Sequence, residues 1–392
     1  MKQWQFTIKS RTYLTELVST CIVKPLQVIR RWCIQLIQSW LYKYSLLGIV
    51  PLFLAGISLS ILLAACSLRN VDNTHNSSVT YQRDVTLTFV SYSVTSAAYE
   101  QIIPEFIEQW KKEHNQNITF NQSYDASRSQ TLAAVIEGKE ADVVHLSLAA
   151  DINQLVEAGF IQSGWEKEAP NNAIVTKSVD AIATRPGNPK NIKTWADLAQ
   201  HGIKIVTANP RTSGAARWNF LNLWGYVTKA GGNENQAIDF ISKVYKNAPL
   251  LPKTARNASE LFFKDGQGDV LLNYEKEMFL SAKDGDKISY VVPDVNISID
   301  NPVAVVDKNV DKHGTRSIAE AFIKFLYTPE SQREFAKLGF RPVDLTIAKE
   351  VEGTFPKIKT IFKAEDLGGW DKIQAKFFDE GAIFDKIRAK KS

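Results

Sequence analysis

Residues 208–220, ANPRTSGAARWNF, decide which fold the sequence predicts. A proline-led turn leads into Ser213, Gly214 and Ala215, and large apolar residues then recur at helical spacing: Phe220, Leu223, Trp224 and Val227. Serine commonly caps helix starts, so the pattern predicts a helix that begins at Gly214 with Ser213 as its N-cap. The first amides of such a helix have no intrahelical partner, and with the helix dipole they favour an anion.

Two further stretches predict helix starts of the same kind. YDASRSQ (124–130) places Ser127 at the mouth of a helix, and TARNASELFF (254–263) places Ala255 just before another. The glycine-bounded strand in GQGDVLLNY ends at Tyr274. Ligands of open α/β sheets bind outside the carboxyl ends of the strands, where helix starts gather. These residues therefore predict a small-anion site at that edge.

Short strands and helices alternate along the rest of the chain. VTLTFVSY (85–92) is a predicted strand that precedes helical apolar spacing over 102–110, and ADVVHLSL (141–148) precedes the helical DINQLVEAGF (151–160). This βαβα order predicts an α/β protein with mostly parallel sheets flanked by helices. A chain of 392 residues is long enough for two domains.

An uncharged segment, SLLGIVPLFLAGISLSILLAA (45–65), directly precedes Cys66. It is long enough to cross a bilayer, and the Lys and Arg residues before it predict that the following residues lie outside the cytoplasm. The Leu-Ala-Ala before Cys66 resembles the lipobox of bacterial lipoproteins, whose cysteine receives lipid. We therefore expect 1–65 to be a long n-region plus signal segment, Cys66 the lipid attachment site and 66–83 a flexible tether. An uncleaved signal anchor is the alternative.

Charge and cysteine content exclude several classes of site. Seven of the 47 Lys and Arg residues and one of the 42 acidic residues precede Cys66, which leaves 40 bases against 41 acids after it. That balance lacks the basic excess needed to bind nucleic acid by charge. The cysteines are Cys21, Cys33 and Cys66, so the body after Cys66 has no thiol for a disulfide or a cysteine metal site.

An enzyme with Ser213 as nucleophile is one alternative that the residues raise. It needs a nearby base, but the histidines stand in no recognisable triad context and their spacing fits no metal site. We find no Gly-rich phosphate loop of the Walker type in the sequence. His145 lies in an apolar strand and is expected to be a core residue. The sequence therefore predicts a protein without catalysis, metal or cofactor.

The run NPRTSGAARWNFLNLWGY (209–226) resembles the periplasmic sulfate-binding proteins of ABC sulfate and thiosulfate permeases. Their corresponding run is typically Asn-Pro-Lys-Thr/Ser-Ser-Gly-Gly-Ala-Arg-Trp-Asn. Further segments resemble the same family in order, so that the resemblance covers 84–392: VSYSVTSAAYEQ, EADVVHLSLAADINQL, RPGNPKNIKTWADL, NPVAVVDKNVD and FLYTPESQREFAKLGFRPV. The resemblance implies a two-lobed type II periplasmic-binding fold, in which crossover strands join two α/β lobes that close on ligand in the cleft.

The resemblance also implies which residues hold the ligand. In that family neutral donors from both lobes bind buried sulfate, and a tryptophan indole at a strand end completes the site. Carried over by position, the other donors are the amides of Ser127, Ser213, Gly214, Ala215 and Ala255, with the Ser213 hydroxyl. Sulfate is only an acceptor at neutral pH, so donors alone satisfy it.

Three positions depart from the family pattern. Tyr274 stands where the family has the indole, and its hydroxyl donates from a different point. Ala215 stands at the second glycine of the motif, where it keeps the amide and adds a methyl group. Ser93 stands where the family has an acidic residue. These changes leave thiosulfate, molybdate or another oxyanion open beside sulfate.

The expected organisation follows from the resemblance. Residues 84–175 are expected to form the first part of lobe I, 176–280 lobe II, and 281–392 a return to lobe I, with C-terminal helices that cross back to lobe II as an open alternative. We expect a monomeric, membrane-tethered periplasmic lipoprotein that passes sulfate or thiosulfate to an ABC permease. A binding protein for another oxyanion and a non-transport interaction protein on the same fold remain the alternatives.

Overall fold

The computed structural model describes residues 84–125, 135–283 and 289–389, all of them within the compact unit 80–392. Cys66, Ser127 and the apolar segment 45–65 lie outside the described residues. Within the described ranges no helix combines the length and apolar character that spanning a membrane requires.

The first lobe is built on a five-stranded sheet of order β2-β1-β3-β10-β4. Its strands are β1 (Val85–Tyr92), β2 (Ile118–Asp125), β3 (Val143–His145), β4 (Ile174–Ser178) and β10 (Ile299–Val305). β1 pairs in parallel with β2 and β3, whereas β10 runs antiparallel to both β3 and β4. The helical elements around it are η2 (Ser93–Thr95), α4 (Ser96–His114), η3 (Val135–Lys139), α6 (Ala149–Glu157), η4 (Trp165–Lys167), η5 (Pro170–Ala173), α11 (Asp307–His313), α12 (Arg316–Leu326), α13 (Pro329–Lys337) and α14 (Leu345–Glu350).

Aromatic packing joins this sheet to its helices. The Phe322 ring of α12 lies 5.5 Å from Phe89 of β1 and 5.1 Å from Phe106 of α4, measured between ring centroids. Phe106 belongs to the apolar spacing predicted over 102–110, and that face of α4 is buried. The Phe89–Phe322 contact is edge-to-face and the Phe106–Phe322 contact is tilted, and such ring pairs stabilise the packing beyond the effect of the area that they bury.

The second lobe is built on a four-stranded sheet of order β6-β7-β5-β8. Its strands are β5 (Asp180–Thr184), β6 (Ile205–Val206), β7 (Val270–Tyr274) and β8 (Ser289–Val291). β6 pairs in parallel with β7, whereas β5 runs antiparallel to β7 and β8. The helical elements around it are η6 (Trp195–Ala199), α7 (Gly214–Lys229), α8 (Glu234–Lys246), α9 (Ala255–Phe263), α10 (Glu275–Lys283), η7 (Glu365–Leu367), α15 (Trp370–Ile373), η8 (Gln374–Phe378) and α16 (Ile383–Ala389).

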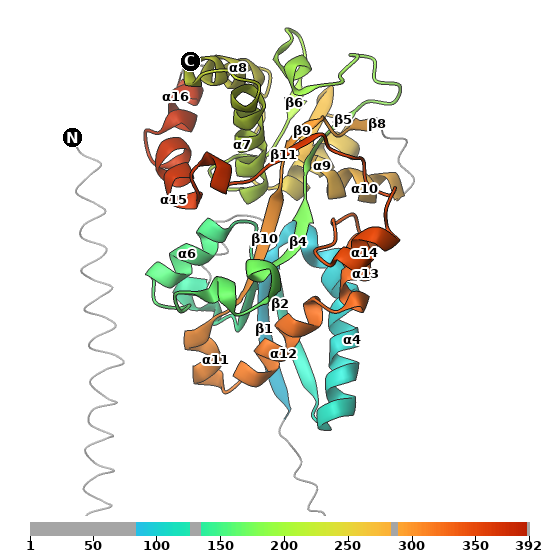
Figure 1. Cartoon of the computed structure of the whole chain (residues 1–392), viewed down its shortest axis with the longest axis vertical. Coiled ribbons are helices and arrows are strands. Elements are labelled where there is room, and N and C mark those ends of the chain that lie inside the picture. The colour runs from blue at the N-terminus through green and yellow to red at the C-terminus, as the bar shows by residue number, and fades with distance from the viewer. Residues whose placement is uncertain (1–83, 126–134, 284–288, 390–392) are drawn as a thin grey trace, which may run out of the picture. The chain divides into compact units, whose positions relative to one another are not determined.

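The chain passes between the lobes on neighbouring strands. β4 belongs to the first sheet and β5, which begins after Val179, to the second; β9 (Val295–Ile297) leads back to β10. Figure 1 shows β4 and β10 side by side between the lobes, in agreement with their antiparallel pairing. β11 (Thr360–Phe362) pairs in parallel with β9 and takes the C-terminal segment to the second lobe.

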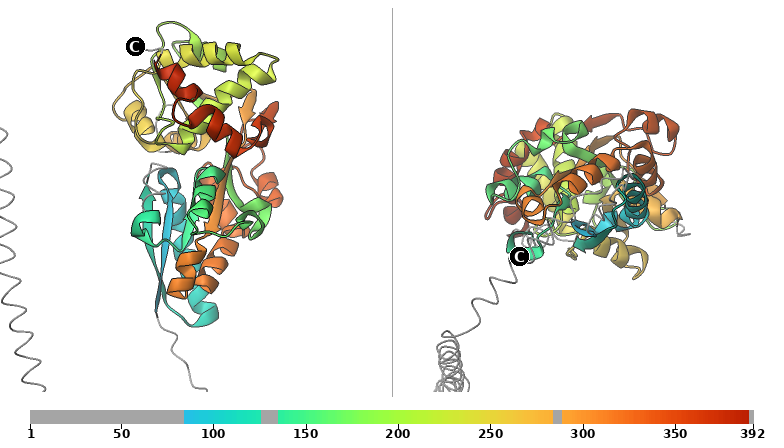
Figure 2. Two further views of the ribbon diagram at one scale, coloured as in Figure 1. Left: turned by 90° about the vertical axis from the view of Figure 1, so that its left-hand side faces the viewer. Right: turned by 90° about the horizontal axis from the view of Figure 1, so that it is seen from below.

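The structure confirms the two-lobed α/β fold and corrects two details. The sheets are mixed rather than mostly parallel, because β5 and β10, the strands next to the crossings, run against their neighbours. The pattern around Phe220 also predicted one buried helix face, but α7 is buried all round from Gly214 to Gly225. The C-terminal elements η8 and α16 cover the side of α7 and α8 that faces away from the sheet (Figure 2).

Candidate ligand-binding site

The start of α7 has the geometry that the sequence predicted. Ser213 is the N-cap, with extended backbone, and its hydroxyl oxygen accepts from the Ala216 amide at 3.4 Å. Gly214 and Ala215 occupy the first two helical positions, and both are buried. Among the described residues neither of their amides has a hydrogen-bond acceptor. Since buried amides are nearly always paired, these two require a partner from outside that set.

The start of α9 repeats this arrangement with a small correction. Ala255 is the first residue of the helix rather than the residue before it, because Thr254 is the N-cap. The Thr254 hydroxyl oxygen accepts from the Asn257 amide at 2.8 Å and its carbonyl from the Ala258 amide at 3.0 Å. The amide of Ala255, a buried residue, is thus a third donor without an acceptor in the described part of the chain, after those of Gly214 and Ala215.

Tyr274 ends β7, as predicted, and is fully buried. Its hydroxyl lies 2.8 Å from the Ser147 hydroxyl of the first lobe. Burial raises the pKa of Tyr274 well above its ordinary value, so the phenol keeps its proton. Asn273 ties this strand end to α9, because its side-chain amide donates to the Ala255 carbonyl at 2.9 Å while its side-chain oxygen accepts from the Tyr274 amide at 2.9 Å.

Ser147 lies where the two lobes are in contact, and the sequence analysis did not single it out. Its carbonyl accepts from the Trp218 indole of α7 and from the Asn301 amide of β10, each at 3.0 Å. A Cβ atom placed on Gly214 would lie 2.5 Å from the Ser147 hydroxyl oxygen, so the start of α7 presses directly on this serine. The available signal was a polar residue in the apolar run ADVVHLSL, just past a strand end.

A second contact between the lobes starts at η2. Ser93 is half-buried there, and its carbonyl accepts from the Ser96 hydroxyl at 3.2 Å. The carbonyl of the next residue, Val94, accepts from the ammonium group of Lys276, a fully buried side chain of α10. Burial lowers the pKa of Lys276 to about 8. Sequence reasoning did not single out this lysine.

A buried carboxylate balances that ammonium group. Glu277 lies 3.4 Å from the Lys276 nitrogen and 3.1 Å from a guanidinium nitrogen of Arg256, and it accepts from the Ser259 hydroxyl at 2.9 Å. The Ser259 oxygen in turn accepts from Asn273 at 3.0 Å. The first turns of α9 and α10 and the end of β7 therefore share one polar network, which holds the Ala255 amide in place.

The structure brings most of the predicted residues to one place. Ala215, Ala255 and Tyr274 share a buried cluster with Val94 and Leu148 of the first lobe. Ser213 and Gly214 adjoin them at the start of α7, and Ser93 adjoins them through Val94. Ser127 cannot be placed, since it lies outside the described residues. The roles of these residues as ligands remain predictions.

His145 is a core residue, as predicted. Its Nδ1 lies 2.7 Å from the Tyr99 hydroxyl and its Nε2 3.3 Å from the Thr176 hydroxyl. Complete burial lowers the pKa of His145 to about 3, so the ring is neutral at physiological pH. The described residues contain no group of three or more His, Cys, Asp or Glu side chains placed to hold a metal ion.

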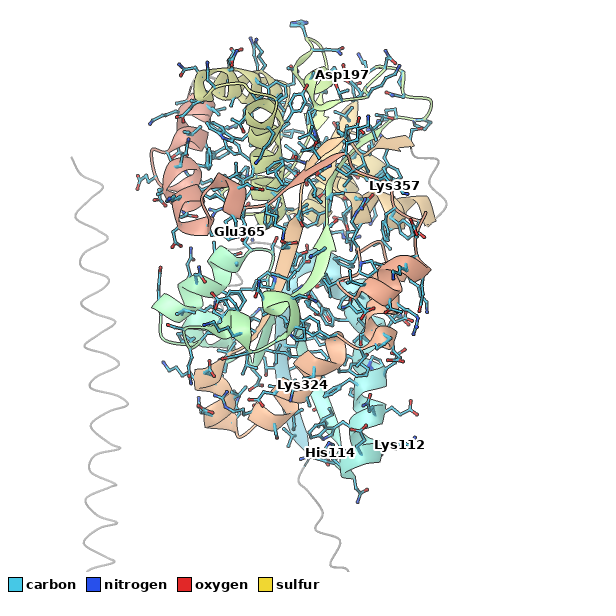
Figure 3. The ribbon with its side chains drawn as sticks, viewed as in Figure 1. Lys112, His114, Asp197, Lys324, Lys357 and Glu365 are labelled. Carbon is cyan, nitrogen blue, oxygen red and sulfur yellow. The ribbon has the colours of Figure 1, made fainter. Side chains whose placement is uncertain are left out.

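A cavity of about 920 Å³ opens beside the junction between the lobes. Asn153 and Trp165 line it from the first lobe and Trp218 and Trp370 from the second. Glu365, which also lines it, lies in Figure 3 between the two lobes, whereas Lys112 points outward at the far end of α4. The Trp218 indole that reaches Ser147 thus also forms a wall of this opening.

Comparisons with known proteins agree with this arrangement. Residues 87–341 match the family model of bacterial extracellular solute-binding proteins. The chain is 54% identical to the sulfate-binding protein of Synechococcus elongatus, over 84% of this chain and 92% of the relative. It is 37% identical to the thiosulfate-binding protein of Pseudomonas aeruginosa, over 76% of this chain and 90% of the relative.

A solved structure shows the same fold. The sulfate-binding protein SubI from Mycobacterium tuberculosis H37Rv matches with a TM-score of 0.69 and 33% identity, covering 75% of this chain and 100% of that one. The chain therefore belongs to the bacterial extracellular solute-binding proteins, in the group of the sulfate-binding and thiosulfate-binding relatives.

Proposed function

We propose that this protein captures sulfate or thiosulfate outside the cytoplasmic membrane and delivers it to an ABC importer, with no chemical step. The observation that carries the proposal is the start of α7. Its Gly214 and Ala215 amides are buried where the two lobes meet, without an acceptor among the described residues. The names of the relatives support the choice of ligand.

The chemistry of the donors favours an acceptor-only anion. Backbone amides of Gly214, Ala215 and Ala255 and the hydroxyl of Tyr274 carry protons and no net charge. A tetrahedral dianion accepts all of them, and the dipoles of α7 and α9 favour its charge. We propose Ser213 as a further ligand, and Ser93 and Ser127 as the first lobe's contribution.

Closure of the two lobes is the proposed binding step. Hydrogen bonds from Tyr274, Trp218 and Lys276 of the second lobe reach Ser147 and Val94 of the first. We propose that the lobes part at the crossings β4–β5 and β9–β10, because a few backbone angles there absorb such a motion. An anion enclosed between the lobes adds contacts that only the closed arrangement provides.

The proposed setting in the cell follows from the N-terminal segment. An extracytoplasmic location agrees with the family that the chain belongs to. We propose that lipid on Cys66 tethers a monomer to the cytoplasmic membrane, with 66–83 as the tether. Mass spectrometry of the membrane-extracted protein tests this, since an unlipidated Cys66 in an otherwise intact chain contradicts it.

Calorimetric titration tests the ligand. The full chain in detergent, freed of bound anion by unfolding and refolding, is titrated with sulfate, thiosulfate, molybdate and phosphate at pH 7. We expect sulfate or thiosulfate to bind with a dissociation constant below about 10 μM, which corresponds to about −7 kcal/mol. Binding of molybdate or phosphate alone would reassign the ligand. A folded protein that binds none of the four contradicts transport of these oxyanions.

A further inference from the structure

Ser147 is held by both lobes at once. Its carbonyl accepts one hydrogen bond from Trp218 of the second lobe and one from Asn301 of the crossover strand β10. Its hydroxyl lies 2.8 Å from that of Tyr274 of the second lobe. The side chain is therefore fixed in position when the lobes are together.

The Ser147 hydroxyl also touches the helix start that carries the free amides. A Cβ atom on Gly214 would lie 2.5 Å from the Ser147 Oγ and 2.6 Å from its Cβ, so only glycine permits this approach. The adjoining amides of Gly214 and Ala215 have no acceptor among the described residues. An anion that accepts from them is consequently within reach of the Ser147–Tyr274 pair.

The Ser147 and Tyr274 hydroxyl groups carry one proton more than the hydrogen bond between them uses. Two hydroxyl groups carry two protons, and the bond between them uses one. The Asn301 side chain also hydrogen-bonds Tyr274, but this bond lowers the pKa of the phenol, as a donor does, so it does not take the second proton. Apart from these contacts, no acceptor for that proton is found among the described residues. The pKa of Tyr274 is raised by burial, so the phenol does not lose that proton to solvent. A buried donor without a partner is costly, and an oxyanion oxygen supplies the missing acceptor.

We propose that Ser147 is part of the anion site, and that the Ser147–Tyr274 pair both fastens the two lobes and donates its spare proton to the bound oxyanion. This inference rests on the proposed function. The pair acts as a unit, because either hydroxyl can donate the spare proton while the other accepts. The ligand is a tetrahedral oxyanion that only accepts hydrogen bonds.

Because the two hydroxyl groups act as a unit, we expect the single variants and the double variant to differ in sulfate affinity. Either Ser147→Ala or Tyr274→Phe removes the hydrogen bond between the two hydroxyl groups but leaves one hydroxyl that donates to the anion. The bond is worth about 1 kcal/mol, so each single variant should bind sulfate about 5- to 10-fold more weakly. The double variant also loses the donor to a charged acceptor, and its affinity should fall by a further factor of about 10 or more.

The test is a calorimetric cycle of the full chain in detergent with sulfate: the unmodified protein, both single variants and the double variant. Ser331→Ala and Tyr245→Phe are matched controls, since each deletes a buried hydroxyl in the same lobe as its counterpart. We expect these controls to bind like the unmodified protein. Circular dichroism confirms that each variant is folded.

Each outcome decides the proposal. A double variant weaker than both single variants supports it. A double variant equal to the single variants overturns it, because the pair then fastens the lobes without touching the anion. Single variants within twofold of the unmodified protein overturn it also, and this result stands even if the double variant does not fold. An unmodified protein that binds no sulfate contradicts the proposed function itself, and with it this inference.

Discussion

The two lobes contribute to the candidate site in different ways. The second lobe supplies backbone amides at the starts of α7 and α9, where Ser213 and Thr254 cap the helices. The first lobe contributes the hydroxyl of Ser147 and the backbone carbonyls of Ser147 and Val94. The donors of the second lobe are thus arranged before the lobes close. The contacts made by the first lobe form only when the lobes are closed.

This difference has a consequence for binding. Donors at a helix start are arranged by local geometry, so the second lobe is ready for an anion by itself. Hydrogen bonds between the two lobes form only on closure, so they adjust the affinity for the anion. We expect changes at the α7 start to have the largest effects and changes on the first-lobe side to have smaller ones.

The largest effect is expected for Ser213→Asp. Aspartate caps helices as well as serine does, but its charge repels the anion. Two unit charges 4 Å apart interact by about 4 kcal/mol at an effective dielectric constant of 20, so sulfate affinity should fall by about 1,000-fold or more. Calorimetric titration measures the loss. Ser213→Asn is the neutral control, since asparagine is also a good cap, and equal losses in both variants would show that the charge is irrelevant.

A smaller loss of sulfate affinity is expected for Gly214→Ala, which tests the close contact between Gly214 of the second lobe and Ser147 of the first. The added methyl group would lie 2.5 Å from Ser147 Oγ. Overpacking costs about 1–3 kcal/mol, so sulfate affinity should fall about 10- to 100-fold. Ser147→Gly in the same chain removes both nearest atoms and should restore part of the affinity. A double variant as weak as Gly214→Ala alone would argue against a clash at Ser147.

About a tenfold loss is expected for Lys276→Met. The variant removes the charge-assisted bond to the Val94 carbonyl, while Glu277 keeps Arg256 and Ser259 as partners. Because this change removes one partner of the buried Lys276–Glu277 pair, the melting temperature should fall as well, to an extent limited by the Arg256 and Ser259 contacts that Glu277 keeps. Lys312→Met, at an exposed ion pair with Glu140, is the control and should change neither quantity. Unchanged sulfate affinity in Lys276→Met would show that the bond to Val94 does not help to hold the lobes closed on the anion.

No change in sulfate affinity is expected for His145→Gln at pH 7, because His145 belongs to the core of the first lobe. Stability is the informative quantity. The folded-state pKa of His145 is about 3, below the ordinary value, so acid favours the unfolded state, which takes up the proton. Between pH 7 and pH 5 this costs about 2 kcal/mol. Urea denaturation should show a shallower acid dependence in the variant, and identical slopes would mean that the ring is accessible to protons.

Much of the second-lobe site could be predicted from the sequence because it is local. The cap at Ser213, the two small residues after it and the strand end at Tyr274 all follow from patterns within a dozen residues. The single predicted face of α7 was wrong because η8 and α16 cover its other side, and these lie about 150 residues further along the chain. The antiparallel strands β5 and β10 escaped prediction for the same reason.

By itself, the sequence determined the α/β class, the family and the positions of the helix starts at Gly214 and Ala255, whose amides we propose to bind an anion. Only the tertiary structure decided what faces those amides. Ser147 and Tyr274 are 127 residues apart, and Val94 and Lys276 are 182 residues apart. Helix starts depend on capping and periodicity, which neighbouring residues carry. A hydrogen bond between two lobes depends on how the whole chain packs, and no local pattern records it.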